Sequence, residues 1–172
     1  VLKAPIAISA SDVDPASTAS PLHQASVRQR LDEGVGIWKQ RQAGRTIYHL
    51  VEAARWQAAK ASEVQADYFP PTYEQDGFIH ATEQAEKLLG VANLFYKSIS
   101  DDFLCLVIDC DKLDAEVKWE APAAVGDKAH DSNQDPGPLF PHIYGGLKIA
   151  AVTREMPVVR LDDGSFENIT GL

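Results

Sequence analysis

The sequence is poor in cysteine, and this shortage excludes one class of protein. Only Cys105 and Cys110 occur in 172 residues, which is too few for the disulfide framework of a small secreted domain. They stand five positions apart in "FLCLVIDCD", a run with the length of a strand, where they point to opposite faces. We therefore expect two reduced, buried thiols.

Basic residues are also scarce, with 16 Lys and Arg against 25 Asp and Glu, for a formal net charge of −9. Binding to a nucleic-acid polymer replaces counterions with clustered Lys and Arg, so this composition argues against such a partner. A small anionic ligand, such as a dinucleotide, remains compatible with the charge, because one local basic or backbone-amide pocket can hold it.

Long apolar runs are missing as well. No stretch approaches the roughly 20 apolar residues that a membrane helix needs, so we expect no membrane partner and a cytoplasmic protein. The first residue is Val rather than Met, which leaves a removed targeting segment as an open alternative.

The chain divides into an N-terminal extension, residues 1–44, and a folded domain, residues 45–172. Residues 1–26 are rich in Ala, Ser and Pro and are typical of a flexible arm. A helix is predicted after it, with Ser26 as its N-cap and Gly44 at its end.

The folded domain alternates short apolar runs with helical stretches. Strands are predicted in 45–51, 78–81, 101–113, 115–123 and 145–164, and helices in 52–62 and 82–99, the second capped by Thr82. A long polar loop spans 126–141 and carries His130, which we expect to be solvated. Together with the helix of the extension, this pattern predicts a mixed α+β fold with two or three helices.

Three histidines lie among apolar neighbours: His49 in "TIYHLV", His80 in "GFIHAT" and His142 in "LFPHIYGGL". A single histidine of this kind is usually a core residue hydrogen-bonded through its ring. Three of them, on separate elements and next to loops, suggest convergence on one crevice. There they could transfer protons, bind a metal ion or hydrogen-bond ribose hydroxyls.

Two further residues are candidates for ligand binding. Tyr144 stands two positions after His142, on the same side of an extended chain and just before two glycines that permit a close approach of a ligand, so its ring could stack on a planar group. Glu120 follows Trp119 at the end of a predicted strand, where a surface charge is an equally good interpretation.

Four motifs together resemble the DUF952 family over about residues 45–160. They are "IYHL" followed by a Trp-containing helix, "GFIHAT" with "EQ" after it, "VKWE", and "FPHIYG", in this order and spacing. The family is grouped with the ADP-ribosyltransferase-like superfamily, so the resemblance implies a split, mixed or antiparallel β-sheet core that grips NAD or an ADP-ribose-like group in a cleft.

The resemblance also implies roles for the site residues. His49 would hydrogen-bond a ribose hydroxyl, and His80 with Thr82 would lie beside the nicotinamide-side ribose or ring. In the third motif active transferases carry a glutamate, whereas this chain has His142 in that region. This departure argues against conventional protein ADP-ribosylation. The RNA 2′-phosphotransferase-like branch also departs from this glutamate pattern. Its members are expected to carry a basic triad of arginines, which this chain lacks, since Arg45 alone does not supply it.

Three functions follow as hypotheses. The first is an ADP-ribosyltransferase-like enzyme with NAD or a related nucleotide as substrate, His49, His80 and His142 as catalytic residues, and Tyr48, Thr82, Glu120 and Tyr144 as substrate-binding residues. The second is a metal site made by the histidines with Glu120 or an acid from 127–135. No HxH or HxxxH spacing supports it, so no metal is expected. The third is a small-ligand-binding module without chemistry.

Overall fold

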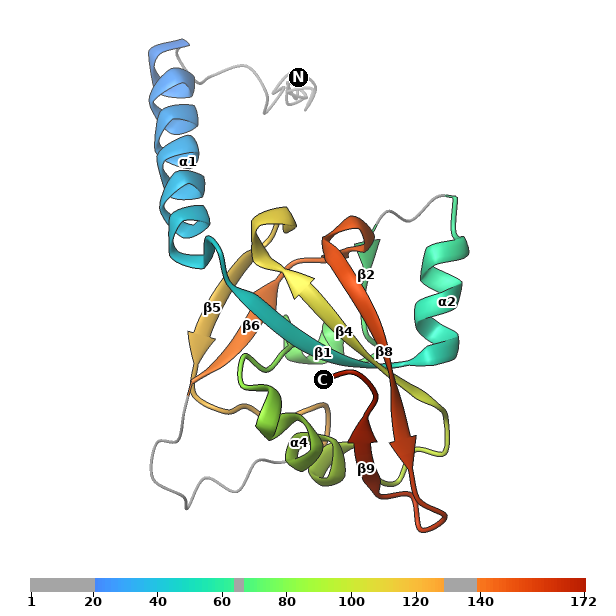
Figure 1. Ribbon diagram of the computed structural model, residues 1–172. Helices are drawn as coiled ribbons and strands as arrows, with labels where there is room; N and C mark the ends of the chain where they lie inside the picture. Colours follow the sequence, from blue (N-terminus) through green and yellow to red (C-terminus); the bar gives the residue numbers. More distant parts are fainter. Residues whose placement is uncertain (1–20, 64–66, 129–138) are drawn as a thin grey trace, which may run out of the picture. The chain divides into compact units, whose positions relative to one another are not determined.

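The computed structural model describes residues 21–63, 67–128 and 139–172 (Figure 1). The chain forms two units, one ending at Ile37 and the other running from Trp38 to Leu172. The arm expected at 1–20 and most of the loop expected at 126–141, with His130, lie outside the described residues.

Helix α1, Pro21–Gln42, starts upstream of the predicted N-cap Ser26, so the part of the expected arm that is described is helical. Its last residue belongs to the second unit. Gln42 is 1% exposed, and its Nε2 donates to the backbone oxygen of Cys110 at 3.0 Å. The end of the predicted extension is thus part of the core of the folded domain.

Nine strands are present in the described residues: Thr46–Glu52 (β1), Asp67–Tyr68 (β2), Ile79–His80 (β3), Phe103–Asp109 (β4), Glu116–Glu120 (β5), Phe140–Tyr144 (β6), Leu147–Lys148 (β7), Val152–Arg160 (β8) and Phe166–Ile169 (β9). The further helices are Ala53–Ala61 (α2), Tyr73–Asp76 (α3) and Leu88–Phe95 (α4), with 3₁₀ turns at Ala85–Lys87 (η1), Cys110–Lys112 (η2) and Ile149–Ala151 (η3). The α+β class is confirmed.

The expected number of two or three helices is too low, because the described residues form four α-helices. The helix without a counterpart in the prediction is α3, a single turn after the prolines at 70 and 71. It ends at Gly77, whose φ of 78° breaks the helix in the left-handed region that glycine tolerates. A helix this short carries no apolar period that a sequence pattern could detect.

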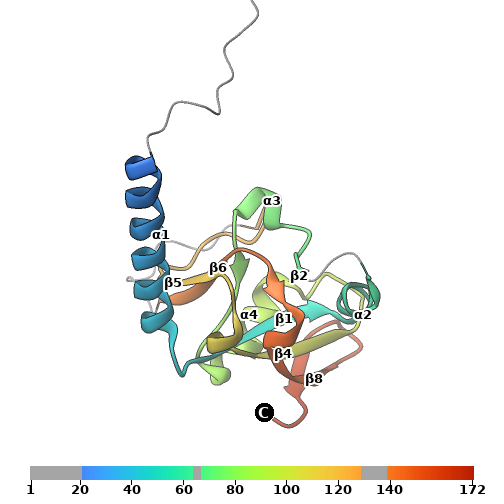
Figure 2. The same ribbon diagram turned by 90° about the horizontal axis from the view of Figure 1, so that it is seen from above.

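The strands pair antiparallel in separate sheets. Four form the order β1-β4-β8-β9, three form β3-β6-β5, and two form β2-β7. Figure 2 shows β5 and β6 side by side. A bridge between Tyr48 and Thr82 connects β1 to the chain after β3 through backbone hydrogen bonds of 2.7 and 2.8 Å.

Helices α2 and α4 pack on opposite faces of β1 and β4 (Figure 1). Side chains of a strand alternate between its two faces, so Ile47 and Val51 meet Trp56 of α2, whereas Leu50 meets Leu88 of α4. Both faces of the sheet are therefore covered by apolar side chains.

The predicted helix at 82–99 is shorter than expected. It consists of η1 and α4, and Thr82 does not cap it. The reason is the bridge to Tyr48, which holds the backbone of Thr82 in an extended pairing. Within the described residues, no helix has the length and apolarity that crossing a membrane requires.

Candidate functional site

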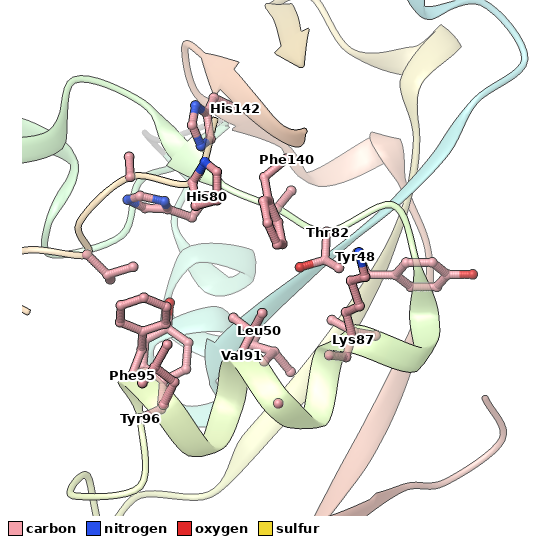
Figure 3. A pocket seen from close by; sticks show the side chains of 17 residues that line it. Tyr48, Leu50, His80, Thr82, Lys87, Val91, Phe95, Tyr96, Phe140 and His142 are labelled. Carbon is pink, nitrogen blue, oxygen red and sulfur yellow. The ribbon is translucent and has the colours of Figure 1, made fainter. Parts of the chain in front are cut away.

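A cavity of about 280 Å³ lies between helix α4 and residues of β1, β3 and β6 (Figure 3). Its wall is mostly apolar and includes Leu50, Leu88, Val91, Phe95, Val125 and Phe140. Binding pockets for drug-sized molecules have volumes of about 300–1,000 Å³. This cavity therefore suits one ring with small substituents, or one end of a larger ligand.

His80, the last residue of β3, lines the cavity and is oriented by a carboxylate. Its Nε2 lies 3.1 Å from Oδ2 of Asp76, whose side chain is 5% exposed and also accepts the backbone N–H of Gly126 at 3.1 Å. Because a carboxylate accepts hydrogen bonds, Nε2–H of His80 donates. The lone pair of the neutral ring is then on Nδ1, which has no hydrogen-bond partner in the described part of the chain.

His142, in the middle of β6, is oriented in the same way. Its Nδ1 donates to Oε2 of Glu120 at 3.1 Å, and the hydroxyl of Tyr144 donates to the same oxygen at 2.8 Å. Phe78 stacks on the imidazole at 4.1 Å between centroids. The lone pair is on Nε2, which has no partner among the residues that the structure describes.

His80 and His142 face each other across the β3–β6 pair, with ring centroids 5.4 Å apart. Directly opposite residues of an antiparallel pair project from the same face of the sheet. Burial lowers the pKa of both imidazoles, and this effect exceeds the opposing effect of Asp76 on His80 and of Glu120 on His142. Both rings are therefore neutral near pH 7 and present hydrogen-bond acceptors to one cavity.

This arrangement supports two kinds of chemistry. The two ring nitrogens can accept hydrogen bonds from N–H or O–H groups of a ligand. Either can also remove a proton as a general base, because the carboxylate behind the ring stabilises the imidazolium that forms. No carboxylate is found among the described residues that line the cavity.

His49 does not line this cavity. Its Nδ1 donates to the backbone oxygen of His80 at 2.7 Å, and its Nε2 is buried without a partner in the described structure. Its ring lies 5.9 Å from Tyr68, on the face of β1 opposite to Tyr48 and Leu50. Burial lowers its pKa to about 4, so the ring stays neutral and connects β1 to β3.

The four predicted substrate-binding residues separate into two pairs. Tyr48 and Thr82 line the cavity. Tyr144 and Glu120 lie outside it and hold His142 through the hydrogen bonds described above. The ring of Tyr144 faces Lys118, whose Nζ is 4.1 Å from the ring centroid.

The glycines after Tyr144 serve the packing of the chain itself. A Cβ atom on Gly146 would lie 2.6 Å from Cβ of Asp67 and 2.7 Å from Cζ of Phe69. The absence of a side chain thus allows β7 to approach β2. This close packing of the two strands explains why a glycine stands at position 146.

The loop after β5 closes one side of the cavity with Pro122, Ala123 and Val125. It is fastened at two places. Gly126 donates to Asp76, as described above, and the ammonium group of Lys128 donates to the backbone oxygen of Phe95 at the end of α4. The described part of this loop is thus fixed to both α3 and α4.

Two important residues were not among the sequence candidates. Asp76 stands four positions before His80, but their contact depends on the chain reversal at Gly77, which no periodic pattern indicates. Lys87 lines the cavity although a lysine in a predicted helix is most simply read as a solvent-exposed residue.

For a metal site, the described residues contain no group of three His, Cys, Asp or Glu side chains that could hold an ion.

Comparison with known proteins identifies the family. Residues 50–155 match the family described as "Protein of unknown function (DUF952)", and the chain belongs to it. The resemblance to the DUF952 family noted in the sequence is thereby confirmed.

The crystal structure of protein CC0527 from Caulobacter crescentus is similar, with 27% identity and a TM-score of 0.54 over 71% of this chain and 93% of that one. A double mutant of CC0527 gives 26% identity, the same TM-score and the same coverage. No curated protein matches the chain.

Proposed function

We propose that this protein is an ADP-ribosyltransferase-like enzyme that binds NAD, or a related nucleotide, by the end that carries the base and its ribose. One observation carries the proposal: His80 and His142 are each oriented by a carboxylate, line the same cavity, and each have one ring nitrogen without a partner among the described residues. Ribose hydroxyls and a carboxamide offer the hydrogen-bond donors that these nitrogens accept.

The size and chemistry of the cavity agree with this ligand end. About 280 Å³ accommodates one ring with its substituents, and the remainder of a dinucleotide would extend beyond the cavity. The apolar wall, with Phe140 and Phe95, suits a planar aromatic ring.

In the proposed reaction, one imidazole acts as a general base. A hydroxyl oxygen of the acceptor attacks C1′ of the ribose while the bond to the nicotinamide nitrogen breaks. The hydroxyl proton passes to the imidazole, and nicotinamide leaves as a neutral molecule. Positioning and proton removal lower the barrier, and the carboxylate behind each ring stabilises its charged form.

His49 receives a different role from the one that the resemblance implied. A ribose hydroxyl does not reach it from this cavity, because its Nδ1 is bonded to the carbonyl of His80 and its ring lies behind β1. We assign it as a positioning residue that fixes the backbone of His80.

A second candidate is a binding module without chemistry. It is favoured by the lack of a carboxylate among the described residues of the cavity wall, since such a group would stabilise the positive charge that develops on the ribose. In this alternative, the two imidazoles only hydrogen-bond the ligand.

Calorimetry with NAD, ADP-ribose and nicotinamide tests the proposal, combined with a chromatographic assay for nicotinamide release from NAD. We expect NAD and nicotinamide to bind and nicotinamide to be released. Two variants are compared, His142→Phe, which keeps a ring against Phe78, and His80→Gln. The variant that removes the general base should reduce release by about 10²–10⁴-fold. Binding without release supports the second candidate. No binding of any of the three at millimolar concentration rejects both.

A further inference from the structure

We infer that the cavity selects a ligand with one anionic group, a phosphate monoester, and that Lys87 and Thr82 bind this group. The inference rests on the proposed function and adds a determinant of specificity to it. It depends on the end of the cavity away from His80 and His142, where Lys87, Thr82 and Tyr48 are grouped in Figure 3.

Thr82 places its hydroxyl on the cavity wall without a hydrogen-bond partner in the described part of the chain. Its backbone N–H and carbonyl are both bonded to Tyr48, at 2.8 and 2.7 Å, so the backbone needs nothing from the side chain. The residue is 4% exposed and lines the cavity, and its hydroxyl makes no hydrogen bond within the described residues. Figure 3 shows this hydroxyl directed into the cavity. A hydroxyl that is left unpartnered on a cavity wall can donate to, or accept from, a ligand atom.

Lys87 likewise has no partner among the residues that the structure describes. It forms no ion pair, side-chain hydrogen bond or ring contact in the part of the chain that the structure describes. It is the last residue of η1 and directly precedes α4, and its side chain makes no capping hydrogen bond. A positive charge at this end of a helix is unfavourable, because the helix dipole is positive there. The stability of α4 therefore does not explain this lysine.

An anion would reverse this unfavourable interaction. The ammonium group of Lys87, the hydroxyl of Thr82 and the positive end of α4 all attract negative charge. Lys87 is also the one side chain with a permanent charge among the described residues of the cavity wall. Since the chain carries a net charge of −9, this local cation decides whether an anionic ligand is attracted or repelled.

The two ends of the cavity define the class of ligand. The imidazoles require hydrogen-bond donors at one end, the apolar wall accepts a ring and its neighbouring atoms, and the Lys87 end requires a negative charge. A nucleoside monophosphate combines these three features in one small molecule. A phosphate ester also provides several acceptor oxygens, so the ammonium and the hydroxyl can bind it at the same time.

Calorimetry on the full chain with nicotinamide mononucleotide and with nicotinamide riboside tests the inference, because these ligands differ only by the phosphate. We expect the mononucleotide to bind about tenfold more tightly or better, which corresponds to about 1.4 kcal/mol. Lys87→Met should reduce the difference to about twofold or less, whereas Lys87→Arg should keep most of it. Thr82→Val, which has the same shape without the hydroxyl, should reduce it in part.

Lys112→Met is the matched control, because Lys112 is exposed, pairs with Asp109 and does not line the cavity. This variant should keep the affinities of the unmodified protein. Equal binding of the two ligands, a difference that survives Lys87→Met, or a loss that Lys112→Met reproduces would each overturn the inference and leave the proposed function standing. Binding of neither ligand would reject the proposed function itself, and the inference with it.

Discussion

Nε2 of His80 lies 3.1 Å from Oδ2 of Asp76, and the same carboxylate accepts the backbone N–H of Gly126. One buried group thus fixes both an imidazole of the cavity and the loop that closes one of its sides. The orientation of His80 and the position of this loop are therefore coupled.

Asp76→Asn should weaken this coupling. An amide offers one acceptor oxygen in place of two and carries no charge, so we expect the pKa of His80 to fall further below its ordinary value. Loss of the buried hydrogen bonds should lower the free energy of unfolding by about 1–3 kcal/mol. NMR titration of the His80 ring and urea unfolding measure the two effects. Glu74→Gln, an exposed change in the same helix, should alter neither. An unchanged or higher pKa for His80 would contradict this role of Asp76.

Stability should decrease in mild acid, chiefly because of His49. Burial lowers its pKa from 6.5 to about 4, so between these values the unfolded chain takes up a proton that the folded chain does not. The stabilisation is therefore complete above about pH 6.5 and is lost as the pH falls toward 4, by about 3 kcal/mol in total. His80 and His142 contribute in the same direction, because burial also lowers their pKa values.

His49→Asn separates the contribution of His49 from those of the other histidines. The amide can donate to the carbonyl of His80 and does not titrate, so the free energy of unfolding should depend less steeply on pH in this range. Urea unfolding at a series of pH values gives the comparison. The same steepness in both proteins would show that His49 is not the main source.

Gly146→Ala should destabilise the protein without touching the cavity. The new Cβ would lie 2.6 Å from Cβ of Asp67, so the backbone near β2 or β7 has to move. We expect a loss of about 1–3 kcal/mol in thermal or urea unfolding. Gly90→Ala is the control, because its Cβ meets nothing within 4 Å and the position is inside α4, where alanine is favoured by about 0.5–1 kcal/mol. A neutral result for Gly146→Ala would show that the strands can separate without cost.

The two cysteines should be unreactive in the folded protein. Cys105 and Cys110 are free and buried, as the sequence predicts, and burial raises the pKa of each to about 12. Since the thiolate is the reactive form, a thiol reagent at pH 8 should label no cysteine in buffer and both in denaturant. Rapid labelling in buffer would mean that the sheet opens readily around β4.

Strands with regular alternation were predictable because their signal is local. The first strand was expected at 45–51 and is Thr46–Glu52. The same alternation places Tyr48 and His49 on opposite faces, so both could not line one cavity. Grouping His49 with the other two histidines relied on similar flanking residues. Those residues describe burial and do not specify the direction of a side chain.

Other parts of the site depend on contacts between distant segments. Leu88, Val91 and Phe95 form an apolar stripe at helical spacing within the helix predicted at 82–99, and all three residues line the cavity. Spacing identifies such a stripe as buried, but it does not distinguish core packing from the wall of a cavity. The contact of Asp76 with His80 likewise requires the turn at Gly77, which is set by a single backbone conformation.

The central claim is that His80 and His142 present neutral, accepting nitrogens to a ligand in one cavity. Long-range ¹H–¹⁵N NMR spectra of the imidazoles, recorded with and without nicotinamide mononucleotide, test it most directly. The account predicts a proton on Nε2 of His80 and on Nδ1 of His142 at neutral pH, and ligand-induced shifts at the other nitrogen of each ring. The opposite tautomers, or no shift at either nitrogen at millimolar ligand, would contradict it.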